Sequence, residues 1–290
     1  MQLPTVPAAR LDARAQLNPE VSVALGKAVW RIVAGNAGMM TGPGTNTYVF
    51  GEHERTVLDP GPDDERHLEA ILATAPNVRW ILATHTHRDH SPLVAKLARR
   101  TGAQVIGLPP PRDGRQDESF APDHAPADGE RLTLGDSTVI AIRTPGHASN
   151  CVCYLLERER LLFTGDHVLE GVSPVILPPD GDMGAYIASL DKLVPLDFDR
   201  IAPGHGDVMP QAKRVLAALR AHRIFREDKA LRCLAGMQDA TIATLTPLVY
   251  DDVPADRHVW ARLTLEAHLI KLLREGRVAQ HGGNWRATQA

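Results

Sequence analysis

The chain has 290 residues, of which 43% are hydrophobic and 23% are charged, as in an ordinary globular protein rather than a disordered one. No apolar run approaches the ~18 residues of a membrane span, and the N-terminus lacks a basic segment followed by an apolar one. Three cysteines are too few for a disulfide framework. We therefore predict a soluble protein of the reducing cytoplasm, with no membrane association and no export signal.

Charge is distributed unevenly along the chain. Residues 211–290 hold 13 Lys and Arg against 8 Asp and Glu, a net charge of +5, whereas residues 1–210 hold 19 against 27, a net charge of −8. A chain of this length can form one large α/β domain with a small appendix. The charge distribution predicts a division into two units at about residue 210.

The first part of the chain carries little signal over residues 1–28 and then shows strand patterns. Apolar and small residues alternate over 29–50, interrupted by a turn at 41–47. A short buried strand over 56–58 runs into Asp59 and a Pro-Gly-Pro turn, and a carboxylate at a strand end is typical of site residues in α/β proteins. The patterns predict further strands at about 79–83, 104–107, 131–134, 137–143, 151–157, 160–163 and 199–202, and helices at about 64–74 and 183–193.

The strand over 79–83 is followed by three histidines and an aspartate within six residues, His85, His87, Asp89 and His90. Because His85 and His87 lie two apart, an extended backbone points both to one side, where they can share an ion. Asp89 and His90 follow at the entry to a helix, where the chain turns and aims them at a neighbouring point. One segment can thus supply two ligands to each of two metals, and Zn²⁺, iron and manganese all accept imidazole and carboxylate.

Three later strand ends offer the same ligand types. His147, Asp166 and His205 each follow a predicted strand in a turn that contains glycine. Burying this many polar groups without a ligand would be costly, so five histidines and two aspartates at recurring strand ends predict a metal centre. Asp59 is expected to orient a ligand histidine rather than to bind metal itself.

Isolated histidines are more often surface or capping residues than ligands, and we give that interpretation to the seven that lie outside these motifs. His167, next to Asp166, is balanced between a substrate contact and a surface residue. The seven are His53, His67, His124, His222, His258, His268 and His281.

Two long loops, 108–129 and 167–182, are expected to rim the site, because loops of this length in compact domains are usually lids or binding segments. They offer polar side chains for substrate contact, although solvated loop charges are an equally good interpretation of each one. The candidates are Arg112, Arg115, His124, His167, Asp180 and Asp182.

From residue 211 the pattern changes to helices without chemistry-bearing motifs, predicted at about 211–235, 240–250 and 256–275. Residues 278–287 predict a closing hairpin. Three helices and a hairpin are the plan of a winged helix, and a basic winged helix favours nucleic-acid binding to a small degree.

The histidine-rich segment 84–90 resembles the signature of the metallo-β-lactamase superfamily, and the later strand-end residues match its other motifs in order and rough spacing. The resemblance covers about residues 29–210. It implies an α/β fold, a four-layer αβ/βα sandwich of two mixed sheets with outer helices, and a dinuclear site at one edge.

The resemblance also implies roles for the site residues. Asp166 would bridge two metals, and Asp89, which contacts both metal and water, is our candidate to orient the attacking water and shuttle its proton. By matching position, His85, His87 and His147 would hold the first metal, and Asp89, His90 and His205 the second.

Within that superfamily the chain resembles the β-lactamase-like group to which an endoribonuclease belongs, through residues 40–48, the Asp59 turn, Arg88 and the winged-helix-like segment. Many relatives have glycine shortly after the Asp-His pair, where this chain has Ser91 and Pro92. Ser91 can cap a helix and Pro92 suits its first turn. We therefore expect a helix to begin near Ser91.

Two dications a few Å apart would lower the pKa of a shared water towards ~7 and polarise a carbonyl or phosphoryl oxygen. We predict a dinuclear zinc-dependent hydrolase of a small ester or thioester, as in the related glyoxalase II enzymes, or of a phosphodiester in single-stranded RNA. Two other interpretations stay open, a mononuclear iron dioxygenase of the same fold and a nucleic-acid-binding module with a vestigial site. Hydrolysis of β-lactams is disfavoured, because those enzymes are usually exported.

Overall fold

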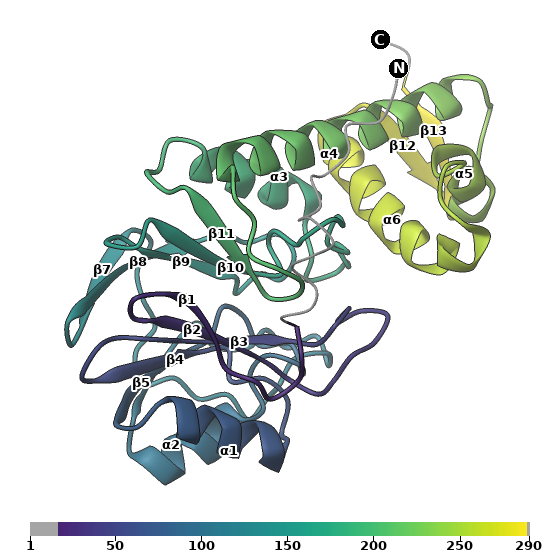
Figure 1. The fold of residues 1–290 in the computed structure, drawn as a ribbon. Coiled ribbons are helices and arrows are strands. Elements are labelled where there is room, and N and C mark those ends of the chain that lie inside the picture. Colours follow the sequence, from purple (N-terminus) through teal and green to yellow (C-terminus); the bar gives the residue numbers. More distant parts are fainter. Residues whose placement is uncertain (1–16, 289–290) are drawn as a thin grey trace.

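Two β-sheets pack face to face in the computed structural model, which describes residues 17–288 (Figure 1). Helices α1 (Glu65–Thr74) and α2 (Val94–Thr101) cover the outer face of one sheet, and α3 (Met183–Leu193) and α4 (Ala212–Ala235) cover that of the other. These four layers confirm the predicted sandwich. The first sheet runs β1 (Val23–Gly26), β2 (Val29–Val33), β3 (Asn46–Phe50), β4 (Arg55–Leu58), β5 (Val78–Leu82) and β6 (Gln104–Ile106), and the second runs β11 (Arg200–Pro203), β10 (Leu161–Gly165), β9 (Val152–Leu156), β8 (Ser137–Arg143) and β7 (Glu130–Leu134).

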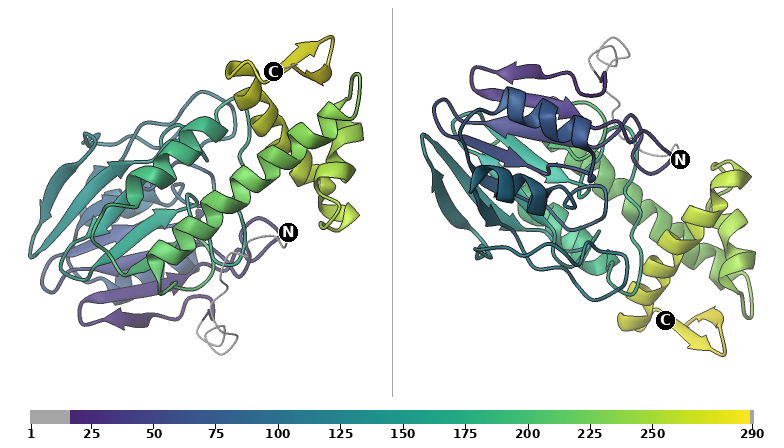
Figure 2. Two further views of the ribbon diagram at one scale, coloured as in Figure 1. Left: turned by 90° about the horizontal axis from the view of Figure 1, so that it is seen from above. Right: turned by 90° about the horizontal axis from the view of Figure 1, so that it is seen from below.

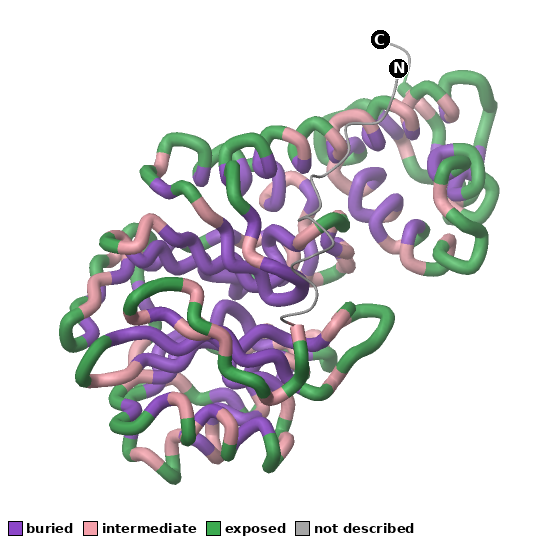
Figure 3. The backbone as a smooth tube through the Cα atoms, viewed as in Figure 1, coloured by how far each residue is buried: buried purple, intermediate pink, exposed green. Residues whose placement is uncertain are grey.

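Three apolar layers hold the sandwich together, and Figure 3 shows the buried backbone concentrated in the two sheets. Between the sheets, Phe163 of β10 contacts Tyr48 and Phe50 of β3, with ring centroids 5.0 and 5.5 Å apart. Such aromatic pairs contribute ~0.5–1.5 kcal/mol beyond the burial of their area. Leu68 of α1 and Leu97 of α2 are buried against the first sheet. Because each sheet is covered on both faces, its central strands are apolar on both sides.

The strand directions bring the ligand-type residues to one edge. β4 and β5 are parallel neighbours, so Asp59 and Thr84, which follow them, lie side by side. β10 and β11 are also parallel, so the turns that carry Asp166 and His205 adjoin. A backbone hydrogen bond of 2.7 Å from the N–H of Val152 to the carbonyl of Thr84 links the two sheets at this edge.

The C-terminal part has the predicted winged-helix plan. Figure 2 shows α4 as one long helix that runs from the second sheet into this part. Its first half contributes Val215 and Leu219 to the core under the second sheet, and its second half contributes Ala230 and Leu234 to the C-terminal core around Trp285. The boundary at residue 210 stays a prediction, since α4 packs in both cores. Beyond α4 come α5 (Ile242–Val249), the short 3-10 helix η2 (Ala255–Arg257), α6 (His258–Arg274), β12 (Val278–His281) and β13 (Asn284–Ala287).

Across residues 17–288, no helix combines the length and the apolar character that crossing a bilayer requires.

Helix α2 begins later than predicted. Its N-cap residue is Leu93, which makes no side-chain capping bond. Ser91, the predicted cap, is buried and donates from Oγ to the Asp117 carboxylate at 2.9 Å. The predicted helix start near Ser91 is therefore wrong, because a contact with the 108–129 loop takes the hydroxyl that would have capped the helix.

Two isolated histidines predicted as surface or capping residues are fully buried, so that prediction is wrong for them. The ring of His67 lies 2.7 Å from Glu20 Oε2 and 2.7 Å from Thr47 Oγ, and His268 Nδ1 lies 3.5 Å from Glu227. Neighbouring carboxylates make burial of an imidazole tolerable. Strand β1 was also missed, because it has only four residues and none of its side chains is buried.

Candidate metal centre

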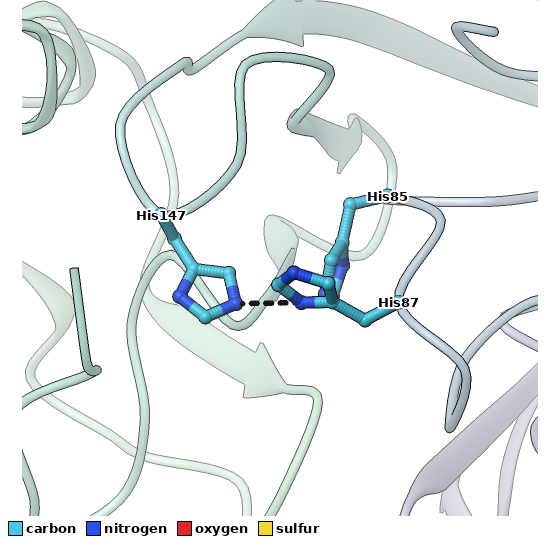
Figure 4. A group of neighbouring side chains, drawn as sticks. All are labelled: His85, His87 and His147. Carbon is cyan, nitrogen blue, oxygen red and sulfur yellow. Dashed lines mark hydrogen bonds between the residues drawn. The ribbon is translucent and has the colours of Figure 1, made fainter. Parts of the chain in front are cut away.

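Donor atoms from four separate turns converge at one edge of the sandwich, and all seven residues predicted as metal ligands are among them. Figure 4 shows one group, in which His85 and His87 from the turn after β5 face His147 from the turn after β8. His147 Nε2 lies 3.0 Å from His87 Nδ1. In each of three groups the donor atoms lie within 4.8 Å of one another, and these groups are His85, His87 and His147; His85, His90 and Asp166; and Asp89, His90 and His205.

Asp166 lies between the groups. Its Oδ1 is 3.3 Å from Nε2 of both His90 and His205, and its Oδ2 is 3.7 Å from Nε2 of His147. Asp89 Oδ2 reaches Nε2 of His205 at 3.2 Å. One carboxylate therefore faces histidines on both sides of the centre.

The donor atoms fit a divalent cation, because several of them make no hydrogen bond and contact only other donors of the cluster. Within residues 17–288, no hydrogen bond reaches the buried Nε2 atoms of His85, His90 and His205 or Oδ1 of Asp166. Each buried polar atom without a partner costs ~1–3 kcal/mol. Four that converge on one place are accounted for by an ion that takes imidazole and carboxylate ligands.

The second ring nitrogen of three of these histidines is held by an acceptor. A proton on Nδ1 of each ring leaves Nε2 free to bind metal, and the acceptor fixes the orientation of the ring. Asp59 was anticipated from the sequence, but the two backbone carbonyls were missed, because every residue carries one. The contacts join Nδ1 of His90 to Asp59 Oδ2 at 3.0 Å, of His147 to the Val175 carbonyl at 2.8 Å, and of His205 to the Gly44 carbonyl at 3.2 Å.

The Asp59 carboxylate is itself fixed on every side. Oδ1 accepts the backbone N–H of Thr84 at 2.7 Å, and Oδ2 accepts the Thr84 hydroxyl at 2.7 Å besides the His90 ring. The Asp59 carbonyl accepts the Thr47 hydroxyl at 2.7 Å. Asp59 has a φ of +50°, a strained conformation for a non-glycine residue that the surrounding bonds must hold.

Two glycines leave the room that the centre needs. A β-carbon at Gly204 would lie 2.4 Å from Asp166 Oδ1 and 2.7 Å from His90 Cε1. At Gly146 it would lie 2.4 Å from the Cα of Tyr186. Glycine therefore precedes His147 and His205 for steric reasons.

The electrostatics divide the histidines into two sets. Burial and then neighbouring imidazoles lower the pKa of His85 well below its ordinary value and that of His87 to about 3. Burial also lowers the pKa of His147, so these three rings are neutral at pH 7, the form that binds metal. Burial opposes charge on the other two rings, but the Asp166 and Asp89 carboxylates raise the pKa of His205 to about 9 and that of His90 well above its ordinary value.

The description "Metallo-beta-lactamase superfamily" belongs to a family model that matches residues 40–205. The chain belongs to the metallo-beta-lactamase superfamily. A second model, "Beta-lactamase associated winged helix domain", matches residues 241–285, which confirms the predicted C-terminal fold. Membership of the superfamily, together with the donor cluster, confirms the prediction that the chain is a hydrolase.

Several known proteins are similar to this chain over most of its length. The "Beta-lactamase-like protein 2 homolog" of Caenorhabditis elegans is 30% identical over 262 residues, which cover 87% of this chain and 86% of that protein. The "Atrochrysone carboxyl ACP thioesterase" of Aspergillus fumigatus is 33% identical over 259 residues, covering 82% and 78%. The crystal structure of a metallo-beta-lactamase family protein from Thermus thermophilus has the same fold, with a TM-score of 0.76 at 22% identity, covering 91% of this chain and 100% of that one.

The two long loops of this metallo-beta-lactamase superfamily member adjoin the donor groups. His87 forms a backbone bridge with Gln116 of the 108–129 loop. Arg115 donates to the carbonyl of Pro178 at 3.1 Å, which ties this loop to the 167–182 loop. Arg115 and Arg112 are both exposed, and their contact with substrate stays a prediction.

Two of the residues predicted to contact substrate, Asp180 and Asp182, make hydrogen bonds or ion pairs within the protein. Asp180 accepts the backbone N–H of Ser149 at 2.8 Å, and Asp182 caps α3 and pairs with Arg274. His167 is fully buried with its ring 4.8 Å from that of Tyr186. The surface alternative for His167 is therefore wrong, and its role as a substrate contact stays a prediction.

Proposed function

We propose that this chain is a dinuclear, zinc-dependent hydrolase of thioesters. The observation that carries the proposal is the convergence of seven imidazole and carboxylate donors, several of which make no hydrogen bond. The donor atoms of Asp89, His90 and His205 lie within 4.8 Å of one another, as do those of His85, His87 and His147. This favours two ions over the single iron of a dioxygenase. A nucleic-acid-binding module with a vestigial site is disfavoured, because none of the seven predicted donors has been lost from the sequence.

Each side of the centre has its own ligand set. When bound, the two cations supply Lewis-acid polarisation of the substrate carbonyl and a water of lowered pKa. In this proposal Asp166 contributes one oxygen to each side. His85, His87 and His147 would hold one ion, and Asp89, His90 and His205 the other.

Asp89 is the residue placed to handle the water. Its side chain is 28% exposed, against 0% for the neighbouring His90, so its carboxylate can orient a water and take its proton. Attack of that water on the carbonyl carbon breaks the C–S bond and releases a carboxylate and a thiol. A thiol is a good leaving group, so a separate general acid is not essential.

A thioester is supported over other acyl substrates by the thioesterase among the relatives, which is similar to this chain over 82% of its length. RNA is disfavoured, because a phosphate backbone needs free cationic surface, whereas most cations of the basic C-terminal part are already paired with carboxylates. The pairs are Arg220 with Asp191, Arg226 with Asp252, Lys229 with Asp251, Lys271 with Glu227, Arg274 with Asp182, Arg277 with Glu275 and Arg286 with Asp239.

Metal content and substrate choice test the proposal together. The purified full chain is analysed for zinc, iron and manganese and then assayed with acyl-pantetheine thioesters, a lactone, a phosphodiester and short single-stranded RNA. We expect two zinc ions per chain and fastest turnover of a thioester. One iron per chain with oxygen uptake, or cleavage of RNA without thioesterase activity, would contradict the proposal.

A matched pair of variants tests the centre itself. Asp166→Ala removes the carboxylate that faces both sides and should lower hydrolysis by at least ~100-fold, because losing a ligand costs more than the 10- to 100-fold typical of an outer contact. Asp197→Ala removes a carboxylate whose side chain is 81% exposed and should leave activity unchanged. Full activity of Asp166→Ala would rule out the dinuclear mechanism.

A further inference from the structure

Arg223 of α4 reaches from the C-terminal part into the surroundings of the metal centre. Its side chain is buried, donates from Nη2 to the carbonyl of Pro174, and places its guanidinium 5.0 Å from the ring centroid of Tyr186. Pro174 belongs to the 167–182 loop, and Tyr186 belongs to α3. One arginine thus joins three segments that lie behind the centre.

Pro174, which Arg223 contacts, is adjacent in the chain to a residue that contacts the proposed metal ligand His147. The next carbonyl along the chain, that of Val175, is the one 2.8 Å from Nδ1 of His147. Arg223 therefore anchors the backbone at one residue while the adjacent residue orients the imidazole. A shift of this backbone would turn the His147 ring away from His85 and His87.

Tyr186, which Arg223 also contacts, touches the segments that carry the proposed ligands Asp166 and His147. The Tyr186 hydroxyl donates to the carbonyl of His167 at 2.8 Å, directly after Asp166. The backbone N of Tyr186 would lie 2.6 Å from a β-carbon at Gly146, directly before His147. Tyr186 thus lies between the segments that carry two of the proposed ligands, with the guanidinium of Arg223 over its ring.

We propose that Arg223 is a positioning residue for the metal centre, acting through the Pro174–Val175 backbone and through Tyr186 on His147 and Asp166. The proposal rests on the proposed function, since it assumes that these residues bind metal. Arginine is suited to the position because a planar guanidinium can stack on an aromatic ring and donate in its own plane at the same time. Lysine could donate to the carbonyl but could not stack in this way.

The same helix offers a closely matched control. Arg226 is also buried, lies 4.6 Å from the ring centroid of Tyr250, and donates to the carbonyl of Val249 at 2.8 Å. It further pairs with Asp252. Its partners belong to the C-terminal core, so it shares the chemistry of Arg223 without contacting the segments behind the centre.

The test compares Arg223→Met with Arg226→Met, since methionine keeps an unbranched stem and removes the guanidinium. Zinc content and chelator competition measure the affinity of each bound ion, and the visible spectrum of the cobalt-substituted chain reports ligand geometry. Both variants should lower the melting temperature. Only Arg223→Met should weaken at least one of the two ions, by ~10- to 100-fold, and change the cobalt spectrum.

Equal metal affinity and an unchanged spectrum in Arg223→Met, or an equal loss in both variants, would overturn the role of Arg223. If Arg223→Met does not fold, Arg223→Lys keeps a charge and a donor, and here a loss of at least ~3-fold is expected, whereas no loss would overturn the inference. Failure of the wild-type chain to bind two ions would instead contradict the proposed function, so the two failures are distinguishable.

Discussion

Replacing Asp59 by asparagine tests whether a residue outside the donor groups controls the centre. Asp59→Asn keeps the size and shape of the side chain but replaces one acceptor oxygen by an NH₂ donor. In the native chain three donors point at this carboxylate, two from Thr84 and one from His90. The amide can satisfy the Thr84 N–H with its one oxygen, and its NH₂ group then faces the other two donors.

The expected loss of metal affinity depends on which of these donors can find another hydrogen-bond partner in Asp59→Asn. The Thr84 hydroxyl can rotate and accept from the new NH₂ group, because a hydroxyl both donates and accepts. The Nδ1–H of His90 has no such freedom in a fully buried ring. Losing one hydrogen bond to a charged acceptor costs ~1.5–3 kcal/mol, which corresponds to roughly 10- to 100-fold in metal affinity.

The assay is chelator competition on the zinc-loaded chain, with thermal unfolding of the metal-free chain as a second measurement. We expect one ion to be lost at lower chelator concentration than in the wild type. The control is Asp136→Asn, since Asp136 is exposed and accepts the backbone N–H groups of Glu52 and His53 in a turn. Equal affinity for both ions in Asp59→Asn and the wild type would refute the reasoning.

Two further predictions concern sterics and pH. Gly204→Ala places a methyl 2.4 Å from Asp166 Oδ1 and should weaken metal binding by more than ~10-fold, whereas Gly236→Ala, whose nearest atom is 3.7 Å away, should leave the zinc content unchanged. The hydrogen bonds from Arg226 hold the pKa of Asp252 below its ordinary value, so this pair stabilises the fold above pH ~4 and the stabilisation is lost as pH falls. Because Asp252 is 34% exposed, Asp252→Asn should cost only ~1–2 kcal/mol at pH 7. Urea unfolding should show that this cost shrinks as pH falls below ~4, the ordinary pKa of an aspartate; a cost independent of pH would contradict the assignment.

The donor groups could be predicted from the sequence because their ligand atoms belong to histidine and aspartate side chains, which the sequence names directly. Imidazoles and carboxylates that recur directly after apolar strands are hard to bury together unless they bind a metal, and the strands that carry them are short and regular. The acceptors that orient the rings could not be predicted in the same way. Gly44 and Val175 act through backbone carbonyls, and such a role leaves no trace in the identity of the residue.

Tertiary contacts also overrode some local signals. Ser91 followed by Pro92 is a favourable helix start by local rules, yet the Ser91 hydroxyl is taken by Asp117. His67 looked like a surface histidine, because its partner Glu20 lies 47 residues away in the sequence. In both cases the deciding contact joins residues that no local window contains.

The change of pattern at residue 211 marks the end of the metal-binding motifs but not the end of the catalytic core. Val215, Leu216 and Leu219 of α4 are buried with residues of α3 and the second sheet, and each such burial contributes ~1.5–3 kcal/mol. Domain boundaries fall where few contacts cross, and a cut at residue 210 would remove this face together with Arg223 and its contact with Pro174. The winged helix is therefore joined to the metallo-beta-lactamase fold through a helix that packs in both cores, and we expect the geometry of the metal centre to depend on the C-terminal part.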